Sequence, residues 1–230
     1  FFSLVHLDVM CGYINKAGII LIDPQFDNVY DFSEGVARVE KSGNWGYINI
    51  EGEFLIEPQF DEASDFSEGL ARVRKGYKCG YINKEGKIVI EPQFDAADNF
   101  LAGVASVRKA GKLGLVTKSG LVVPPILDNY HWAAEGIIAL YANGRRGLLF
   151  VEEETYIPCE YEEIAQGSDA ENWVIVMKNK KWGWVDHSGK TKIPCRYDAV
   201  TPFDAEGKAW VFQFGERFRI NRKGEMVWER

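Results

Sequence analysis

The sequence predicts an all-β protein built from seven tandem, three-stranded antiparallel β-meanders. Three observations carry this prediction: a repeated triplet, short segments of alternating polarity, and a four-residue turn that ends in glycine. The triplet is clearest at Trp45-Gly46-Tyr47, and its central position recurs at Gly12, Gly46, Gly80, Gly114, Gly147, Gly183 and Phe218. Subtraction gives steps of 34, 34, 34, 33, 36 and 35 residues. A period in this range is typical of stacked supersecondary units, because one such unit cannot bury its own apolar face.

One unit shows how each strand is recognised. Its three short segments alternate polar and apolar side chains and include β-branched or aromatic residues: 70–74, 79–83 and 87–90. This pattern is typical of strands. Asn83 suits the start of a type I turn between the last two segments, and glycine accepts the left-handed conformation that closes the hairpin. We therefore expect an antiparallel meander, with a positive φ at Gly86 and at its counterpart Gly52.

Alternation along each strand also predicts which side chains are buried. Gly80 and Ile82 share one face of the middle strand, and Ala71 and Val73 share one face of the first strand. Small residues on an apolar face allow a second sheet to approach closely, so we expect successive units to stack face against face. On this basis Ile82, Ala71, Val73 and the equivalent Ile48 are almost fully buried.

A proline follows the third strand in the first units, as at Pro92. Proline cannot donate a hydrogen bond to a β-ladder, so we expect the strand to end there. The link that follows carries Phe66, which we expect to anchor the loop as an apolar plug, because a link of this length needs one to stay ordered.

These motifs together resemble the WG repeat family. The residues that carry the resemblance are Asn-Trp-Gly-Tyr-Ile-Asn at 44–49, Lys-Trp-Gly-Trp-Val-Asp at 181–186 and Phe-Ser-Glu-Gly-Leu-Ala-Arg-Val at 66–73. The resemblance covers essentially the whole chain and implies a β-repeat protein, often part of a larger bacterial protein, with no general biochemical activity assigned. The departures are residues in place of the signature tryptophan and of the turn's Asn and Gly: Cys11, Cys79, Leu113, Arg146, Arg217, Phe150 and Glu153.

We interpret residues 1–230 as a single WG-repeat β domain, because the repeat runs from end to end without a linker rich in Pro, Gly or Ser. The sequence lacks an initiator Met, so we expect a fragment of a longer chain or a processed product. Ring closure hides sheet edges and slightly favours a propeller-like ring. An open β-superhelix or solenoid stays the alternative, because propeller blades typically have four strands.

Composition excludes several classes of function. The net charge of -7 argues against nucleic acid as a partner, because phosphate binding requires clustered Lys and Arg. No apolar run approaches the ~18 residues of a membrane span. Residues 1–8 lack the features of a signal peptide. We slightly favour a cytoplasmic location, although a targeting segment can be missing from the start. The four cysteines occupy repeat positions and are interpreted as small hydrophobic residues.

The sequence contains no recognisable catalytic constellation. Its three histidines, His6, His131 and His187, have no metal-ligand spacing, and neither a phosphate-binding glycine loop nor a nucleophile elbow is found. Six of the seven units have one acid after the proline segment: Asp27, Asp61, Asp95, Asp128, Glu162 and Asp198. We interpret these as turn residues rather than calcium ligands, because calcium takes about 6–8 oxygens. We therefore expect no enzyme activity, no cofactor and no metal.

The outward-facing column of the first strand is the feature that changes most along the chain. It reads Leu4, Arg38, Arg72, Ser106, Ala139, Ile175 and Trp210. Divergence on a regular frame is how repeat proteins form a binding surface. Packing against a neighbouring segment outside this chain is an equal alternative. The candidate partner-binding residues are Trp132, Tyr141, Arg145, Trp173 and Trp210.

The sequence thus favours a non-enzymatic repeat scaffold that binds a protein partner. Large aromatic and arginine side chains dominate interface energetics, which is why they are chosen as anchors. The hypothesis requires some of the three tryptophans to be exposed to solvent. Two alternatives stay open: a carbohydrate-binding module that uses exposed aromatics, and a regulatory domain attached to an enzyme.

Overall fold

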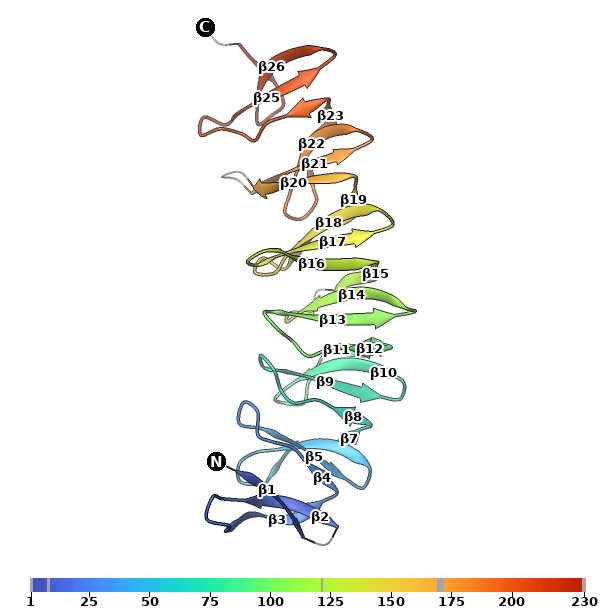
Figure 1. The fold of residues 1–230 in the computed structure, drawn as a ribbon, viewed down its shortest axis with the longest axis vertical. Coiled ribbons are helices and arrows are strands. Elements are labelled where there is room, and N and C mark those ends of the chain that lie inside the picture. The colour runs from blue at the N-terminus through green and yellow to red at the C-terminus, as the bar shows by residue number, and fades with distance from the viewer. Residues whose placement is uncertain (1, 8, 121, 169–171, 229–230) are drawn as a thin grey trace. The chain divides into compact units, whose positions relative to one another are not determined.

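The computed structural model describes residues 2–7, 9–120, 122–168 and 172–228. Within these residues the chain is all-β without a helix, and its strands form seven antiparallel sheets (Figure 1). The all-β prediction is therefore confirmed. The chain divides into two compact units, Phe1–Pro125 and Ile126–Arg230, and each is described by itself.

The first unit contains four sheets. The first has three strands, β1 (Ser3–Leu7), β2 (Met10–Ile14) and β3 (Ile20–Phe26). The second has β4 (Asn28–Val29), β5 (Ala37–Lys41), β6 (Asn44–Ile48) and β7 (Phe54–Phe60). The third has β8 (Glu62–Ala63), β9 (Leu70–Lys75), β10 (Lys78–Asn83) and β11 (Ile88–Phe94). The fourth has β12 (Ala96–Ala97), β13 (Val104–Lys109), β14 (Lys112–Thr117) and β15 (Val122–Leu127).

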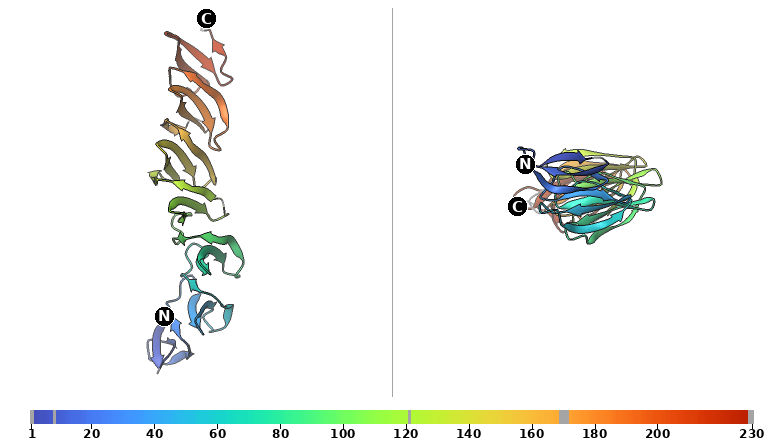
Figure 2. Two further views of the ribbon diagram at one scale, coloured as in Figure 1. Left: turned by 90° about the vertical axis from the view of Figure 1, so that its right-hand side faces the viewer. Right: turned by 90° about the horizontal axis from the view of Figure 1, so that it is seen from below.

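The second unit contains three sheets, which follow one another along its length (Figure 2). The first has β16 (Asn129–Ala134), β17 (Ile137–Ala142), β18 (Arg145–Phe150) and β19 (Thr155–Tyr161). The second has β20 (Glu163–Ser168), β21 (Trp173–Lys178), β22 (Lys181–Asp186) and β23 (Thr191–Tyr197). The third has β24 (Ala199–Val200), β25 (Lys208–Gln213), β26 (Glu216–Asn221) and β27 (Met226–Val227).

Six of the seven sheets have four strands rather than the three that the sequence predicts. The additional strand lies at the edge, and in four of these sheets it has only two residues, as in β4, where Asn28 pairs with Glu40 and Val29 with Val39. The amide of Asp27 also donates to the carbonyl of Glu40, at 2.8 Å, so the chain joins the next sheet directly after β3 ends. A two-residue strand is too short to show a period in the sequence.

The proline does not end the third strand, which corrects a second expectation. Pro58 lies inside β7, where the register against β6 shifts between the pairs Trp45–Phe60 and Tyr47–Ile56. Proline is tolerated in a sheet at such a bulge, because no ladder hydrogen bond is required of it there.

The bulge also explains the repeated glycine. A Cβ atom at Gly46 would lie 2.5 Å from the carbonyl oxygen of Ile56 and 2.7 Å from the nitrogen of Pro58. The glycine therefore makes room for the bulged strand of its own sheet, rather than for the approach of another sheet.

The expected burial and turn geometry are confirmed. Ile48, Ile82 and Ala71 have 0% exposure and Val73 has 1%. Gly52 and Gly86 have φ values of 84° and 75°. In the first unit one buried cluster joins residues of adjacent sheets, which are Tyr47 and Ile56 on one side and Ala71, Val73 and Ile82 on the other, with Phe66 from the link between β8 and β9. Successive sheets therefore stack face against face, as predicted.

Candidate functional site

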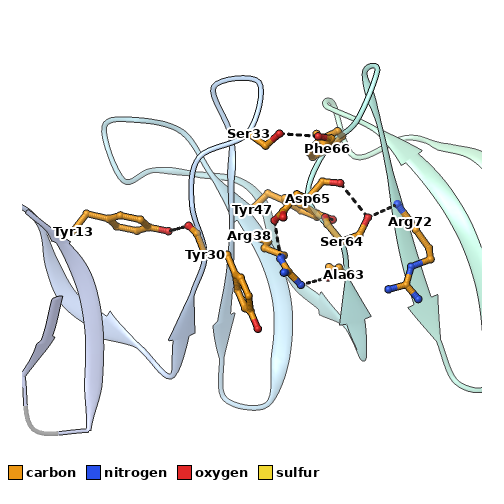
Figure 3. A network of polar contacts seen from close by, with 10 residues as sticks. All are labelled: Tyr13, Tyr30, Ser33, Arg38, Tyr47, Ala63, Ser64, Asp65, Phe66 and Arg72. Atoms are coloured by element: carbon orange, nitrogen blue, oxygen red, sulfur yellow. Dashed lines mark hydrogen bonds and ion pairs between the residues drawn. The ribbon is translucent and has the colours of Figure 1, made fainter. Parts of the chain in front are cut away.

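In the first unit, three large side chains fill the space between the sheet β4–β7 and the sheet β8–β11 (Figure 3). These side chains are Arg38, Tyr47 and Phe66. The Tyr47 hydroxyl donates to the carbonyl of Ser64 at 2.8 Å, and its ring lies 4.8 Å from that of Phe66. The Arg38 guanidinium forms an ion pair with Asp65 at 2.7 Å. Tyr47 and Phe66 are 0% and 2% exposed, so this space is closed.

The tyrosine–phenylalanine pair recurs on both sides of this contact. Tyr81 donates to the carbonyl of Asp98 at 2.7 Å and lies 5.0 Å from Phe100, and Tyr13 packs in the same way on Phe32. Burial raises the pKa of the Tyr47 and Tyr81 hydroxyls above their ordinary value, so these groups stay protonated and act as donors.

Hydrogen bonds from the plug loops add to these contacts. The Ser33 hydroxyl donates to the carbonyl of Phe66 at 2.8 Å, and the Ser67 hydroxyl donates to that of Phe100 at the same distance. Phe66 is buried, as expected of a plug. The sheets of the first unit are therefore joined by both apolar packing and directional bonds.

In the second unit, the contact between the sheets β16–β19 and β20–β23 lacks two of these large side chains. Counted from the repeated glycine Gly147, Ala139 stands where Arg38 stands and Leu148 replaces Tyr47. Each replacement is smaller than the original. The result is a cavity of about 340 Å³ between the two sheets, which we call the inter-sheet pocket.

The inter-sheet pocket is largely apolar, with a polar end. Its lining residues are His131, Ala133, Ala134, Ile137, Ala139, Tyr141, Arg146, Gly147, Leu148, Phe150, Ile164, Ala165 and Val174. The His131 ring stacks on Tyr141 at 5.4 Å with an interplanar angle of 23°. Arg146 is exposed, and within the described part of the chain it forms no ion pair. None of these lining residues is an acid.

One wall of the pocket is the edge strand β16. It has six residues where β4, β8, β12 and β24 have two, and five of its side chains are exposed while Tyr130 is half-buried. Trp132 is 45% exposed. The described strands leave the outer backbone edge of β16 unpaired, because its sheet has the order β16–β17–β18–β19.

The next contact in the same unit is closed, which shows that the pocket is local. At the positions equivalent to Ala139 and Leu148, the sequence carries Ile175 and Trp184, and Phe203 follows in the link. Trp184 is 1% exposed and lies 5.1 Å from Phe203, and Ile175 is buried in the same cluster.

Some of the first-strand residues predicted to face outward therefore lie between two sheets instead. Ala139 and Ile175 are 8% and 7% exposed, because this face of each sheet packs against the following sheet. The drift from arginine to alanine and isoleucine changes how the sheets fit together. Alternation identifies faces, but it does not show which face a neighbouring sheet covers.

The five candidate partner-binding residues lie in different surroundings. Tyr141 lines the pocket, and Trp132 lies on β16, whose residues form one wall. Arg145 forms an ion pair with Glu162 at 2.9 Å. Half-buried Trp173 packs edge-on against Phe203 at 5.7 Å, and Arg217 lies 4.0 Å above the half-buried ring of Trp210.

Sequence reasoning missed Arg146 and Ala139 as site residues. In the sequence Arg146 stands out only as a departure from the signature tryptophan, and Ala139 only as one member of the changing column. The available signal in the sequence is that the two positions in register with Arg38 and Tyr47 become smaller together.

The repeated acids accept hydrogen bonds from the turn that joins the two long strands following them. Asp61 accepts from the amide of Gly76 at 2.6 Å, and Asp95 from that of Ala110 at 2.7 Å. The hydrogen bond from Lys78 and that from Ala110 lower the pKa of Asp95. Among the described residues, no group of three or more His, Cys, Asp or Glu could hold a metal ion.

All four cysteines are free. Cys11 and Cys79 are buried in the apolar positions of their sheets, and Cys159 and Cys195 are half-buried. The described residues also include no helix of the length and hydropathy needed to cross a membrane.

The fold and its repeated inter-sheet contacts define an all-β tandem-repeat protein. The model of the family described as "WG containing repeat" matches residues 12–45, 45–79, 80–112, 154–182 and 182–213, which together make up more than half of the chain. The chain belongs to this family, so the resemblance seen in the sequence is confirmed. The matches leave out residues 113–153, and this stretch contains the pocket walls β16, β17 and β18.

No curated protein matches the chain. Among solved structures, a eukaryotic initiation factor is similar at 8% identity and a TM-score of 0.41, over 97% of this chain and 71% of that one. Hsv2p of Kluyveromyces lactis is similar at 9% identity and a TM-score of 0.39, over 90% and 84% of the two chains. PorZ of Porphyromonas gingivalis, a component of the type-IX secretion system, is similar at 10% identity and a TM-score of 0.35, over 98% and 36%. TM-scores below 0.5 do not define a shared fold, so the family assignment rests on the family match alone.

Proposed function

We propose that the chain is a non-enzymatic repeat scaffold that binds a protein partner through its second unit. The observation that carries this proposal is the inter-sheet pocket, which is open where the equivalent contacts at Tyr47 and at Trp184 are closed and is bordered by the exposed strand β16. Repeat proteins form binding surfaces by local divergence on a regular frame. An apolar cavity with a few polar groups at one end is the usual form of a ligand site.

The contacts of the pocket residues favour binding over catalysis. A catalytic imidazole needs an acceptor or acid that orients it and a reacting group within hydrogen-bond reach. The described contact of His131 is instead a ring stack on Tyr141. Aromatic rings and an arginine at the rim of an apolar cavity suit the anchor residues of an interface.

Photo-crosslinking in the cells that make the protein tests this proposal. A benzophenone side chain is placed at Trp132, beside the pocket, and in a matched variant at Tyr77, which lies in the first unit and is 93% exposed. We expect a discrete cross-linked protein from position 132 that is absent from position 77. Equal labelling from both positions, or none from position 132, would contradict the proposal.

Carbohydrate binding is the second candidate, favoured by the exposed ring of Trp132 on β16. A glycan array probed with the wild-type chain and with Trp132→Ala separates the two. Saturable glycan binding that is lost in Trp132→Ala, without a cross-linked protein, would replace the first proposal by the second.

The seven-unit ring, slightly favoured by the sequence over an open superhelix, is part of the same proposal. The seven sheets support a count of seven repeats, and closure into a ring would leave fewer exposed sheet edges. A compact chain of 230 residues has a radius of gyration of about 17 Å. Small-angle X-ray scattering would support a ring with a value near this figure, and a much larger value would favour the open arrangement.

A further inference from the structure

We infer that the inter-sheet pocket recognises the C-terminal residue of a partner polypeptide, with its apolar side chain inside the cavity and its α-carboxylate at Arg146. The inference rests on the proposed function, because it names the part of the partner that binds. It follows from the size of the cavity, from the charge at its rim and from the free strand beside it.

The cavity has room for about one large side chain. Its volume of about 340 Å³ lies at the small end of the ~300–1,000 Å³ that is typical of ligand pockets. Aliphatic residues line it from both sheets, with Ala139 and Leu148 on one side and Ile164 and Val174 on the other. A segment of several residues would not fit, whereas one terminal residue would.

The side chains lost from this contact indicate which shape fits. In the first unit, the equivalent space holds the paired rings of Tyr47 and Phe66, at 4.8 Å. In the second unit, the next contact holds Trp184 and Phe203. An aromatic or large aliphatic terminal side chain would therefore supply the apolar contact that Ala139 and Leu148 do not provide.

The charge at the rim selects an anion. Arg146 is the one Lys or Arg among the described lining residues, and no acid accompanies it. The planar guanidinium matches a carboxylate through two parallel hydrogen bonds, which a neutral amide cannot accept equally well. The Tyr141 hydroxyl at the same end can donate a further bond.

The exposed strand β16 favours a polypeptide over a free carboxylic acid. Its outer backbone edge is unpaired within the described chain, and it forms a wall of the cavity through His131, Ala133 and Ala134. Residues that precede the partner's terminus can lie along this strand and pair with it, as in β-strand addition. A free acid would leave this strand without a contact.

The test measures binding of fluorescein-labelled pentapeptides to the purified chain by fluorescence anisotropy. The peptides end in phenylalanine, with either a free or an amidated C-terminus. The variants are Arg146→Gln, which removes the charge, and Leu148→Trp, which fills the cavity as Trp184 fills the next contact. Arg217→Gln is the matched control, because Arg217 occupies the same repeat position and lies on Trp210.

We expect saturable binding of the free-acid peptide, weakened about tenfold or more by amidation or by Arg146→Gln, in line with the loss of a charge-assisted hydrogen bond. The two changes should not add, because they remove the same contact. Arg217→Gln should bind like the wild type, and Leu148→Trp should not bind. Arg146→Gln keeps the test valid if Leu148→Trp fails to fold, because Arg146 is exposed.

Equal affinity for the acid and the amide, or equal effects of Arg146→Gln and Arg217→Gln, would overturn the inference. Binding of 3-phenylpropanoic acid as tight as that of the pentapeptide would overturn its polypeptide part. If none of the peptides binds while the benzophenone at position 132 still cross-links a protein, the inference is contradicted and the proposed function is supported. If the free-acid peptide binds but no protein is cross-linked in cells, the proposed function is contradicted instead.

Discussion

The two units use the same repeat, but one contact between sheets of the second unit differs from the contacts in the first. In the first unit, the contact that contains Tyr47 and Phe66 is closed by a ring pair, a hydrogen bond to a buried carbonyl and the Arg38–Asp65 ion pair. In the second unit, the contact at Ala139 and Leu148 is open and holds the inter-sheet pocket. The strands within each sheet are unaffected. A repeat protein can therefore form a cavity by changing only the side chains between two of its sheets.

Packing between sheets can change while strand pairing within each sheet stays the same, because the two depend on different atoms. Strands within a sheet are held by backbone hydrogen bonds, which do not require particular side chains. Contacts between sheets depend on side-chain volume and on the few polar groups that are positioned there. The following predictions compare matched positions in the two contacts.

The largest expected effect comes from the plug. Phe66→Ala should lower the free energy of unfolding by about 3–5 kcal/mol, because it empties a filled contact in which Phe66 is 2% exposed. Leu148→Ala, in the open contact, should cost less than about 2 kcal/mol, since its side chain is only half-buried. Urea unfolding of both variants measures the difference. Equal costs would mean that the pocket is as tightly packed as the first unit.

The tyrosine hydroxyl should have a smaller effect. Tyr47→Phe removes the donor to the carbonyl of Ser64 and should cost about 1–3 kcal/mol, the usual penalty for an unsatisfied buried group. Leu148→Phe should be neutral or stabilising, because it adds apolar volume to a cavity. Thermal unfolding provides the measurement, and a destabilised Leu148→Phe would contradict the presence of free space.

Alkaline pH should affect the first unit more than the second. Burial raises the pKa of Tyr13, Tyr47 and Tyr81 in the first unit, and of Tyr161 in the second. Burial also raises the pKa of the two half-buried cysteines of the second unit, so the comparison uses a chain in which both are replaced by serine. The unfolded chain ionises tyrosine near pH 10, while the folded chain keeps the proton. This stability is therefore complete below about pH 10 and is lost as the pH rises through the folded pKa values. Hydrogen exchange followed between pH 8 and 11 should show earlier loss of protection in the first unit.

The smallest effect concerns the two arginines. Arg38→Gln should cost about 0.5–1 kcal/mol, because its ion pair with Asp65 is partly exposed. Arg146→Gln should change stability by less than about 0.5 kcal/mol, because Arg146 is exposed and has no described ion pair. Chemical denaturation of both variants checks this. A large cost at Arg146 would assign it to the structure of the sheet rather than to ligand binding.

Most of the local structure could be predicted from the sequence. The turn at Gly52 and Gly86 depends on residues within the hairpin itself, and its positive φ was predicted correctly. The burial of Ile82 and Val73 follows from alternation along single strands. These features depend on neighbours a few residues away, so the linear pattern contains the information needed.

Less of the candidate site could be predicted. Trp132 and Tyr141 were selected as large aromatic residues and lie on the strands that border the pocket, whereas Trp173 and Trp210 pack against Phe203 and Arg217. Composition shows that a residue can anchor a partner. Whether its ring is available depends on which groups of the next sheet cover it.

The sequence by itself determined the repeat, the antiparallel hairpins, the buried faces and the family, because each depends on the local order of residues. The tertiary structure decided three other features: the fourth strand of six of the sheets, the bulge that requires Gly46, and the cavity beside Ala139 and Leu148. The strand and the bulge arise when separate segments pair within a sheet. The cavity is a volume between two facing sheets, and it exists only once both surfaces are brought together.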